Sequence, residues 1–145
     1  MGPIDDLTFI GRRGRISSGK AFMGNLVGIK PMGDSNADGY VSVLAKAKGI
    51  KKALKATALY VKALAKDIEN QYVFIMHSVR DALAHDMKEQ LEAVVSCKKI
   101  FISDVFASCG TNIGPGMISV YFMGDPVSED SSYEKQALLT ALGEC

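Results

Sequence analysis

The segment Gly14–Ala21, GRISSGKA, has a glycine, a lysine and serines at a spacing that could bind phosphate. It follows the pattern G-x-x-x-x-G-K-[ST], in which the lysine reaches the terminal phosphates and the last hydroxyl holds magnesium. Here the last position is Ala21, which offers no oxygen to a metal ion. Leu7, Phe9 and Ile10 before it have near-helical spacing, whereas a phosphate loop follows a buried strand. The hypothesis of a nucleotide-dependent enzyme therefore rests on this segment alone.

His77 is a second candidate, because it stands where a predicted buried strand ends and a helix begins, a common position for ligands. No cysteine or carboxylate stands at an obvious metal-ligand spacing from it, and His85 is eight residues away. A packed or hydrogen-bonded histidine is the simpler interpretation. Ser78 is interpreted as a helix cap, because no G-x-S-x-G elbow surrounds it.

The segment 110–116, GTNIGPG, is a third candidate. Its three glycines allow a backbone to approach a ligand closely, and Pro115 stiffens the turn. Thr111 and Asn112 add donors that could meet a carboxylate. The segment is either a binding loop or a plain connection between two strands.

Lysines recur along residues 48–68, where the apolar residues share one helical face. A row of cations on a helix attracts a nucleic-acid backbone or the acidic surface of a protein partner. No aromatic platform or helix-turn-helix pattern stands beside it, so a solvated outer face is the alternative interpretation. The lysines are Lys48, Lys51, Lys52, Lys55, Lys62 and Lys66.

The composition bounds the class of protein. A chain of 145 residues with 48% apolar and 23% charged residues is typical of one globular domain, and no apolar run is long enough for a membrane span. Residues 1–66 carry 12 basic and 4 acidic side chains, against 5 and 12 in residues 67–145, giving +8 and −7. Without a leader or a myristoylation signal, we expect a cytoplasmic protein. Cys97, Cys109 and Cys145 fit neither a disulfide framework nor a metal site.

Helical and strand patterns alternate along the chain, which predicts an α/β fold of the α+β type: a mixed sheet of about five strands covered by helices. Capping boxes at Ser78–Asp81 and Ser131–Glu134 open two of the helices. The helices are expected near 7–10, over 20–28 after a Ser17 or Ser18 cap, over 48–68, after 81 and from 131 through Leu138 and Leu142. The strands are expected in a hairpin around the turn 33–39, over 72–76, over 98–106 and over 117–122.

Taken together, these landmarks resemble the second half of the DegV family of bacterial fatty-acid-binding proteins. The resemblance runs the length of the chain in a consistent order. It consists of DDL at 5–7, GRIS at 14–17, GNLVGIKP at 24–31, the Asp38-Gly39 turn followed by KAKGIKKAL, a strand ending in His77-Ser78, and Gly114-Pro115-Gly116. It implies that residues 1–145 are the lipid-binding C-terminal domain of a two-domain DegV-like protein, whose first domain has no counterpart here.

The resemblance implies that GRIS lines a cleft between two domains, where a long-chain fatty acid buries its tail and keeps its carboxylate near polar residues. The residue types agree, since Arg15 offers a forked cation beside Ser17, and an apolar wall follows. That wall consists of Ile16, Phe22, Met23, Leu26 and Ile29. The family usually has His-Thr before Gly-Pro-Gly, whereas Asn112-Ile113 precedes Gly114 here and supplies an amide donor.

The family's role implies that this chain is a carrier and not an enzyme, with no cofactor. It would present its lipid to a separate ATP-dependent fatty acid kinase, which makes the acyl phosphate. Half of a cleft leaves apolar surface exposed, so we expect the isolated domain to bind lipid weakly and to self-associate. The alternative is a basic domain that binds nucleic acid or an acidic protein through the lysine-rich helix.

Overall fold

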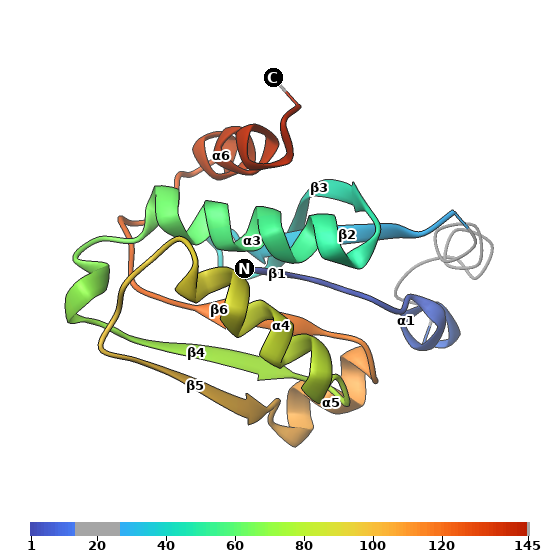
Figure 1. Cartoon of the computed structure of the whole chain (residues 1–145). Helices are drawn as coiled ribbons and strands as arrows, with labels where there is room; N and C mark the ends of the chain where they lie inside the picture. Colours follow the sequence, from blue (N-terminus) through green and yellow to red (C-terminus); the bar gives the residue numbers. More distant parts are fainter. Residues whose placement is uncertain (14–26, 145) are drawn as a thin grey trace.

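The computed structural model describes residues 1–13 and 27–144, which form helices packed against strands (Figure 1). The mixed α/β class expected from the sequence is confirmed. The strands are β1 (Gly2–Pro3), β2 (Ile29–Ser35), β3 (Val41–Lys48), β4 (Tyr72–His77), β5 (Lys99–Asp104) and β6 (Ile118–Tyr121). The helices are α1 (Thr8–Arg12), α3 (Ile50–Leu64), α4 (Asp81–Glu92), α5 (Ala107–Ile113) and α6 (Ser132–Leu142), with a 3-10 turn, η1, at Ile68–Asn70.

The strands form two three-stranded sheets, where one mixed sheet of about five strands was expected. In the order β1-β2-β3 all pairs are antiparallel, whereas in β5-β4-β6 strand β4 is parallel to β5 and antiparallel to β6. The two sheets meet at β1 and β6, because Val120 N donates to the Met1 carbonyl at 2.8 Å and Ile4 bridges Met117. Strand β1 is only two residues long, so the junction consists of isolated contacts instead of a ladder.

The hairpin of β2 and β3 confirms the sequence prediction, although β2 continues into the segment 33–35 that was assigned to the turn. Its turn depends on Asn36, whose side-chain oxygen accepts a hydrogen bond from Tyr40 N at 2.8 Å. Gly39 adopts a φ of 81°, which a glycine reaches without steric cost. The turn residues seen in the sequence therefore do what their types predict.

Helix α3 is buried on two sides, because it serves two hydrophobic cores. Leu54 and Val61 pack with β4, β6 and α4, whereas Tyr60 packs with β2, β3 and α6. Leu138 and Leu142 of α6 are buried in the second core, as the sequence predicted. The lysines of α3 point outward, which confirms the amphipathic pattern.

Both predicted capping boxes are wrong, although helices begin close to each. Helix α4 has Arg80 at its N-cap with no side-chain cap, and the Ser78 hydroxyl donates instead to the Gly114 carbonyl. At α6 the N-cap residue Ser131 makes no cap bond, and Glu134 accepts hydrogen bonds from the backbone N–H and hydroxyl of Ser128. In both cases the side chain that local spacing assigned to the cap makes its hydrogen bond with a partner outside the helix.

Across residues 1–13 and 27–144, no helix combines the length and the apolar character that a membrane span requires.

Candidate functional site

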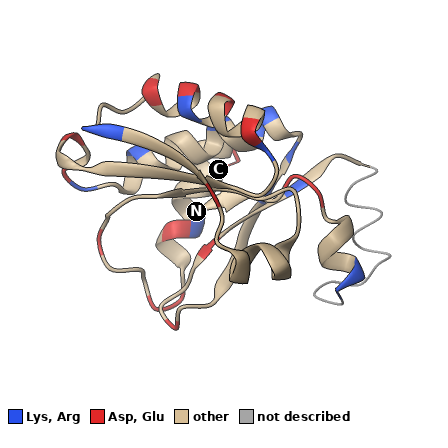
Figure 2. Ribbon diagram, turned by 90° about the horizontal axis from the view of Figure 1, so that it is seen from below, with Lys and Arg blue, Asp and Glu red and all other residues tan. Residues whose placement is uncertain are grey.

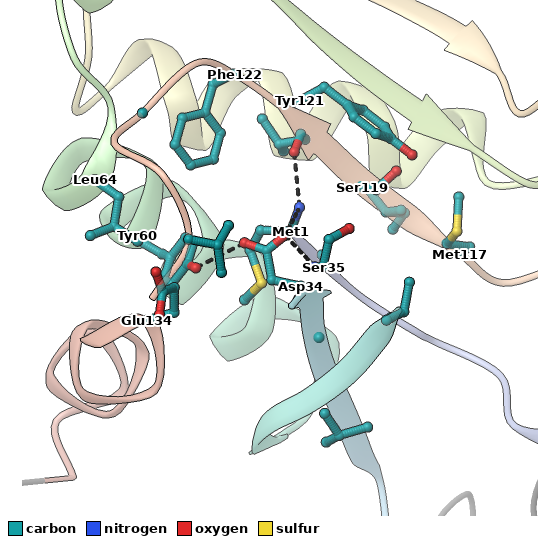
Figure 3. A pocket seen from close by; sticks show the side chains of 18 of the residues that line it. Met1, Asp34, Ser35, Tyr60, Leu64, Met117, Ser119, Tyr121, Phe122 and Glu134 are labelled. Carbon is teal, nitrogen blue, oxygen red and sulfur yellow. Dashed lines mark hydrogen bonds and ion pairs between the residues drawn. The ribbon is translucent and has the colours of Figure 1, made fainter. Parts of the chain in front are cut away.

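An open groove lies where the two sheets meet, with a volume of about 340 Å³. This is within the size range of small-molecule sites, about 300–1,000 Å³. Strands β1, β2, β3 and β6 line it, and it reaches Tyr60 and Leu64 of α3 and Glu134 of α6 (Figure 3). We call this hollow the groove.

Two glycines on the floor of the groove lie where neighbouring backbones approach closely. Gly33 pairs with Gly2 on one side and with Val43 on the other. The antiparallel bridge of Ile4 to Met117 brings Gly2 opposite Ser119, and a Cβ added to Gly2 would lie 2.6 Å from the Ser119 Cα. Side chains are therefore absent from the floor where the backbones approach most closely.

The walls of the groove are largely apolar. Val41 and Val43 are 78% and 59% exposed along β3, and Tyr121 on β6 is 52% exposed. Ile4 and Met117 add apolar surface between them. The period-two alternation of side chains along these strands could have indicated the apolar walls from the sequence, but the sequence interpretation did not use it.

Acidic groups gather at the inner end of the groove. The Tyr60 hydroxyl donates to Asp34 Oδ2 at 2.8 Å (Figure 3), and burial followed by the negative charge of Asp34 raises the pKa of Tyr60. Glu134 and Asp125 also line this end. The cations there are paired, Lys66 with Asp125 at 2.9 Å and the Met1 ammonium with Asp34 at 3.2 Å. This end is therefore unsuited to an anionic ligand group.

The segment 110–116 is not a loop throughout, since its first four residues belong to α5. Backbone hydrogen bonds such as Gly114 N to the Gly110 carbonyl, at 2.7 Å, favour the helix. Ile113 lines the groove. The Asn112 amide donates to the Ser108 carbonyl at 2.8 Å. Neither Asn112 nor Gly114 lines the groove, and the Phe9 ring occupies the space beside Gly114, 2.2 Å from where a Cβ would lie.

Of the other predicted site residues, one lies away from the groove and the rest lie outside the described residues. Ile29 pairs with Lys48 at the start of β2 and does not line the groove. The phosphate-like segment 14–21 and the helix predicted over 20–28 lie outside the described residues, apart from residues 27 and 28. So do the site residues Arg15, Ile16, Ser17, Phe22, Met23 and Leu26.

His77 lies between two carboxylates, which sequence spacing did not identify. Parallel pairing of β4 and β5 brings Asp104 Oδ1 within 3.5 Å of His77 Nδ1, and Asp81 Oδ1 lies 3.7 Å from Nε2. Arg80 N also donates to Nδ1, at 3.3 Å. Within residues 1–13 and 27–144 no group of three His, Cys, Asp or Glu side chains is arranged to hold a metal ion. His77 is therefore a buried, hydrogen-bonded histidine at a strand end.

Asp5 ties together segments that flank the groove, and the sequence interpretation missed this role. Its carboxylate lies 2.9 Å from Lys30 Nζ and 3.0 Å from Arg80 Nε, and its N–H donates to the Gly116 carbonyl at 2.6 Å. Burial raises the pKa of Asp5, but the hydrogen bonds and charges of Lys30 and Arg80 outweigh it, so the pKa lies below its ordinary value. Arg13 makes a further link, donating to the Thr111 carbonyl at 3.3 Å.

The opposite charges of the two halves of the chain meet within the fold. Lys52 and Lys66 pair with Glu144 and Asp125, at 3.2 and 2.9 Å. Figure 2 shows basic and acidic segments spread over several elements. Part of the positive charge of the lysine-rich segment is thus paired with acidic residues of the same chain. Its role as a nucleic-acid surface stays an untested prediction.

A family model described as "Uncharacterised protein, DegV family" matches residues 3–125. The chain therefore belongs to the DegV family. A DegV domain-containing protein of Clostridium perfringens is 38% identical over 125 residues, which are 84% of this chain and 42% of the relative. The chain thus spans about two fifths of the length of that relative.

Solved structures show the same fold. A fatty acid binding DegV family protein from Streptococcus agalactiae matches with a TM-score of 0.65 and 29% identity, over 81% of this chain and 41% of that one. A DegV family protein from Ruminococcus gnavus, described with vaccenic acid, matches with a TM-score of 0.66 and 24% identity, over 81% and 42%. The second likeness concerns the fold alone.

Proposed function

We propose that this domain binds a long-chain fatty acid and that the groove holds part of the acyl chain. The observation that carries the proposal is the apolar groove at the junction of the two sheets, in a domain of a family with fatty-acid-binding members. Glycines on the floor and valines on the wall provide a surface without charges for the tail. Each methylene removed from water there contributes about 0.8 kcal/mol.

The distribution of charge orients the ligand. Asp34, Asp125 and Glu134 repel a carboxylate from the inner end of the groove. The opposite end reaches Ile113, and the Arg13 guanidinium lies beside Thr111 on the same helix. The head group therefore lies toward α5, where Arg13 supplies a cation that pairs with a carboxylate.

The finer role that we propose is that of a carrier. The domain holds the lipid, a separate ATP-dependent fatty acid kinase phosphorylates its carboxylate, and this chain contributes no catalytic group. The groove is open, so a second domain of the longer protein completes the cleft. The isolated chain then binds lipid weakly and self-associates through its exposed apolar face.

Titration of the chain with oleate, kept below the concentration at which it forms micelles, tests the binding proposal. Val43→Lys introduces a charge into the wall and should weaken binding about tenfold, equivalent to 1.4 kcal/mol. Tyr40→Lys is the matched control, because Tyr40 is exposed on the same hairpin but does not line the groove. Equal losses in both variants, or no binding by the unmodified chain, would contradict the proposal.

The carrier role has its own test. We expect purified kinase and ATP to form acyl phosphate from oleate only when the lipid-binding protein is present, with its second domain supplied. Lipid extraction and mass spectrometry of that longer protein should recover fatty acids. Binding that falls steeply with added salt would favour the nucleic-acid or acidic-protein alternative instead.

A further inference from the structure

The floor of the groove contains a buried hydroxyl for which the described residues provide no hydrogen-bond partner. Ser119 is 8% exposed, and among the residues that the structure describes its Oγ has no hydrogen-bond partner. Buried hydroxyls in proteins are almost always hydrogen-bonded, because an unpaired one loses its interaction with water and gains nothing. A polar atom in this state suggests a ligand that supplies the missing partner.

The position of Ser119 in the sheet directs its side chain to the groove. On β6 it alternates with Ile118 and Val120, which pack into the core, and it lies on the same side as Tyr121 (Figure 3). On the neighbouring strand β1 the residue opposite is Gly2, which has no side chain to cover the hydroxyl. Ser119 therefore lines the groove, with its Oγ buried among the lining residues.

The surroundings of Ser119 indicate which kind of ligand group fits. The charged groups that line the groove are three carboxylates, from Asp34, Asp125 and Glu134, and two cations that are already paired. Lys66 is paired with Asp125, and the Met1 ammonium is paired with Asp34. Among the groove residues that the structure describes, no cation is free to balance the charge of a carboxylate placed beside Ser119. An uncharged oxygen needs no such partner, and a serine hydroxyl can both donate to it and accept from it.

We infer that Ser119 is a specificity-determining residue, which hydrogen-bonds an uncharged oxygen carried along the acyl chain. The ligand class is an oxygenated long-chain fatty acid, with a hydroxyl or keto group between its carboxylate and its methyl end. The inference rests on the proposed function, since it requires an acyl chain in the groove. A hydrogen bond from Ser119 gives the groove a preference for an oxygenated acyl chain. An apolar wall alone would disfavour a polar group on that chain.

Paired titrations of the full chain with stearate and with hydroxystearates that differ in hydroxyl position test the inference. We expect one positional isomer to bind about three- to tenfold more tightly than stearate, the range that one net hydrogen bond provides. Ser119→Ala should abolish this preference, because the variant has no hydroxyl to bond an oxygen on the acyl chain. Ser103→Ala is the control, since Ser103 lies in the same cross-strand row but outside the groove.

The outcomes separate the two proposals. If the unmodified chain binds stearate and every hydroxystearate equally, the inference about Ser119 is wrong and the fatty-acid site stands. If Ser119→Ala weakens stearate as much as the hydroxystearates, the hydroxyl contacts the head group and the inference is again wrong. If no ligand binds, the proposed function fails first. The comparison within the unmodified chain keeps the test valid even if Ser119→Ala does not fold.

Discussion

Asp5 is a carboxylate whose ionised form stabilises the fold, because it bonds Lys30 and Arg80 from two other segments. Its pKa is lowered in the folded state. The stabilisation is thus present above the unfolded pKa of about 3.9 and is lost as the pH falls through the folded value. We expect Asp5→Asn to lower the free energy of unfolding by about 1–2 kcal/mol at neutral pH. Urea unfolding at several pH values should show this difference shrinking below about pH 4.

The control for Asp5 is Asp86→Asn, because Asp86 is exposed on α4. It should have little effect at any pH. A loss in Asp5→Asn that does not change with pH would show that its charge is not the source of the stabilisation.

Val79 adopts a φ of 54°, in the left-handed region that a β-branched residue rarely occupies. Its side chain is 75% exposed, so little packing compensates for the strain. We expect Val79→Gly to raise the free energy of unfolding by up to about 1 kcal/mol, measured by thermal denaturation. Val41→Gly, at an exposed position in β3, should lower it. Destabilisation by Val79→Gly would mean that the strain is outweighed by contacts of the valine.

The elements themselves were largely predictable from local patterns. Alternation and the turn residues predicted the hairpin, and helical periodicity predicted α3, since both signals arise within one segment. The Ser78 cap was wrong because its partner, the Gly114 carbonyl, is distant in sequence. The pairing of His77 with Asp104 was missed for the same reason, since it depends on strand order. Contacts that need the tertiary fold cannot be predicted from spacing.

Ser78→Ala distinguishes the loop contact from the predicted cap. If Ser78 fixes the loop, the variant should speed hydrogen exchange of the Asp5 amide, which bonds Gly116, and leave α4 unchanged. A stability loss of about 1–2 kcal/mol is expected for the buried hydroxyl that is removed. Faster exchange confined to the first turn of α4 would instead support the capping box.

The outer face of the strands presents exposed aromatic rings next to the groove. Phe74 and Phe101 stack at 5.2 Å, and Tyr72 lies 5.9 Å from Phe101. Since exposed apolar patches drive association, we expect the chain to form dimers or larger species in light scattering. Phe74→Lys should shift it toward monomer, whereas Phe106→Lys, on an exposed residue outside the strands, should not. A concentration-independent monomer would contradict this expectation.

The arrangement of the whole molecule was predicted less well than its parts. The α/β class followed from alternating elements, but two sheets joined at β1 and β6 were not foreseen. The junction depends on Gly2, where an added Cβ would lie 2.0 Å from the Ile118 carbonyl oxygen. No local pattern marks so close an approach between segments more than a hundred residues apart. The groove arises at this junction, which is why most of its lining was not among the predicted site residues.

The location of the bound acyl chain can be measured directly by NMR of the methyl-labelled chain during titration with oleate. The groove predicts saturable shifts of the Val43, Ile113 and Met117 methyl groups, with the Leu91 methyls of the core unaffected. Intermolecular contacts from the labelled acyl chain should reach the same methyl groups. Shifts confined to the surface around His77 and Ile102, or no saturable shift at all, would contradict a fatty-acid site in the groove.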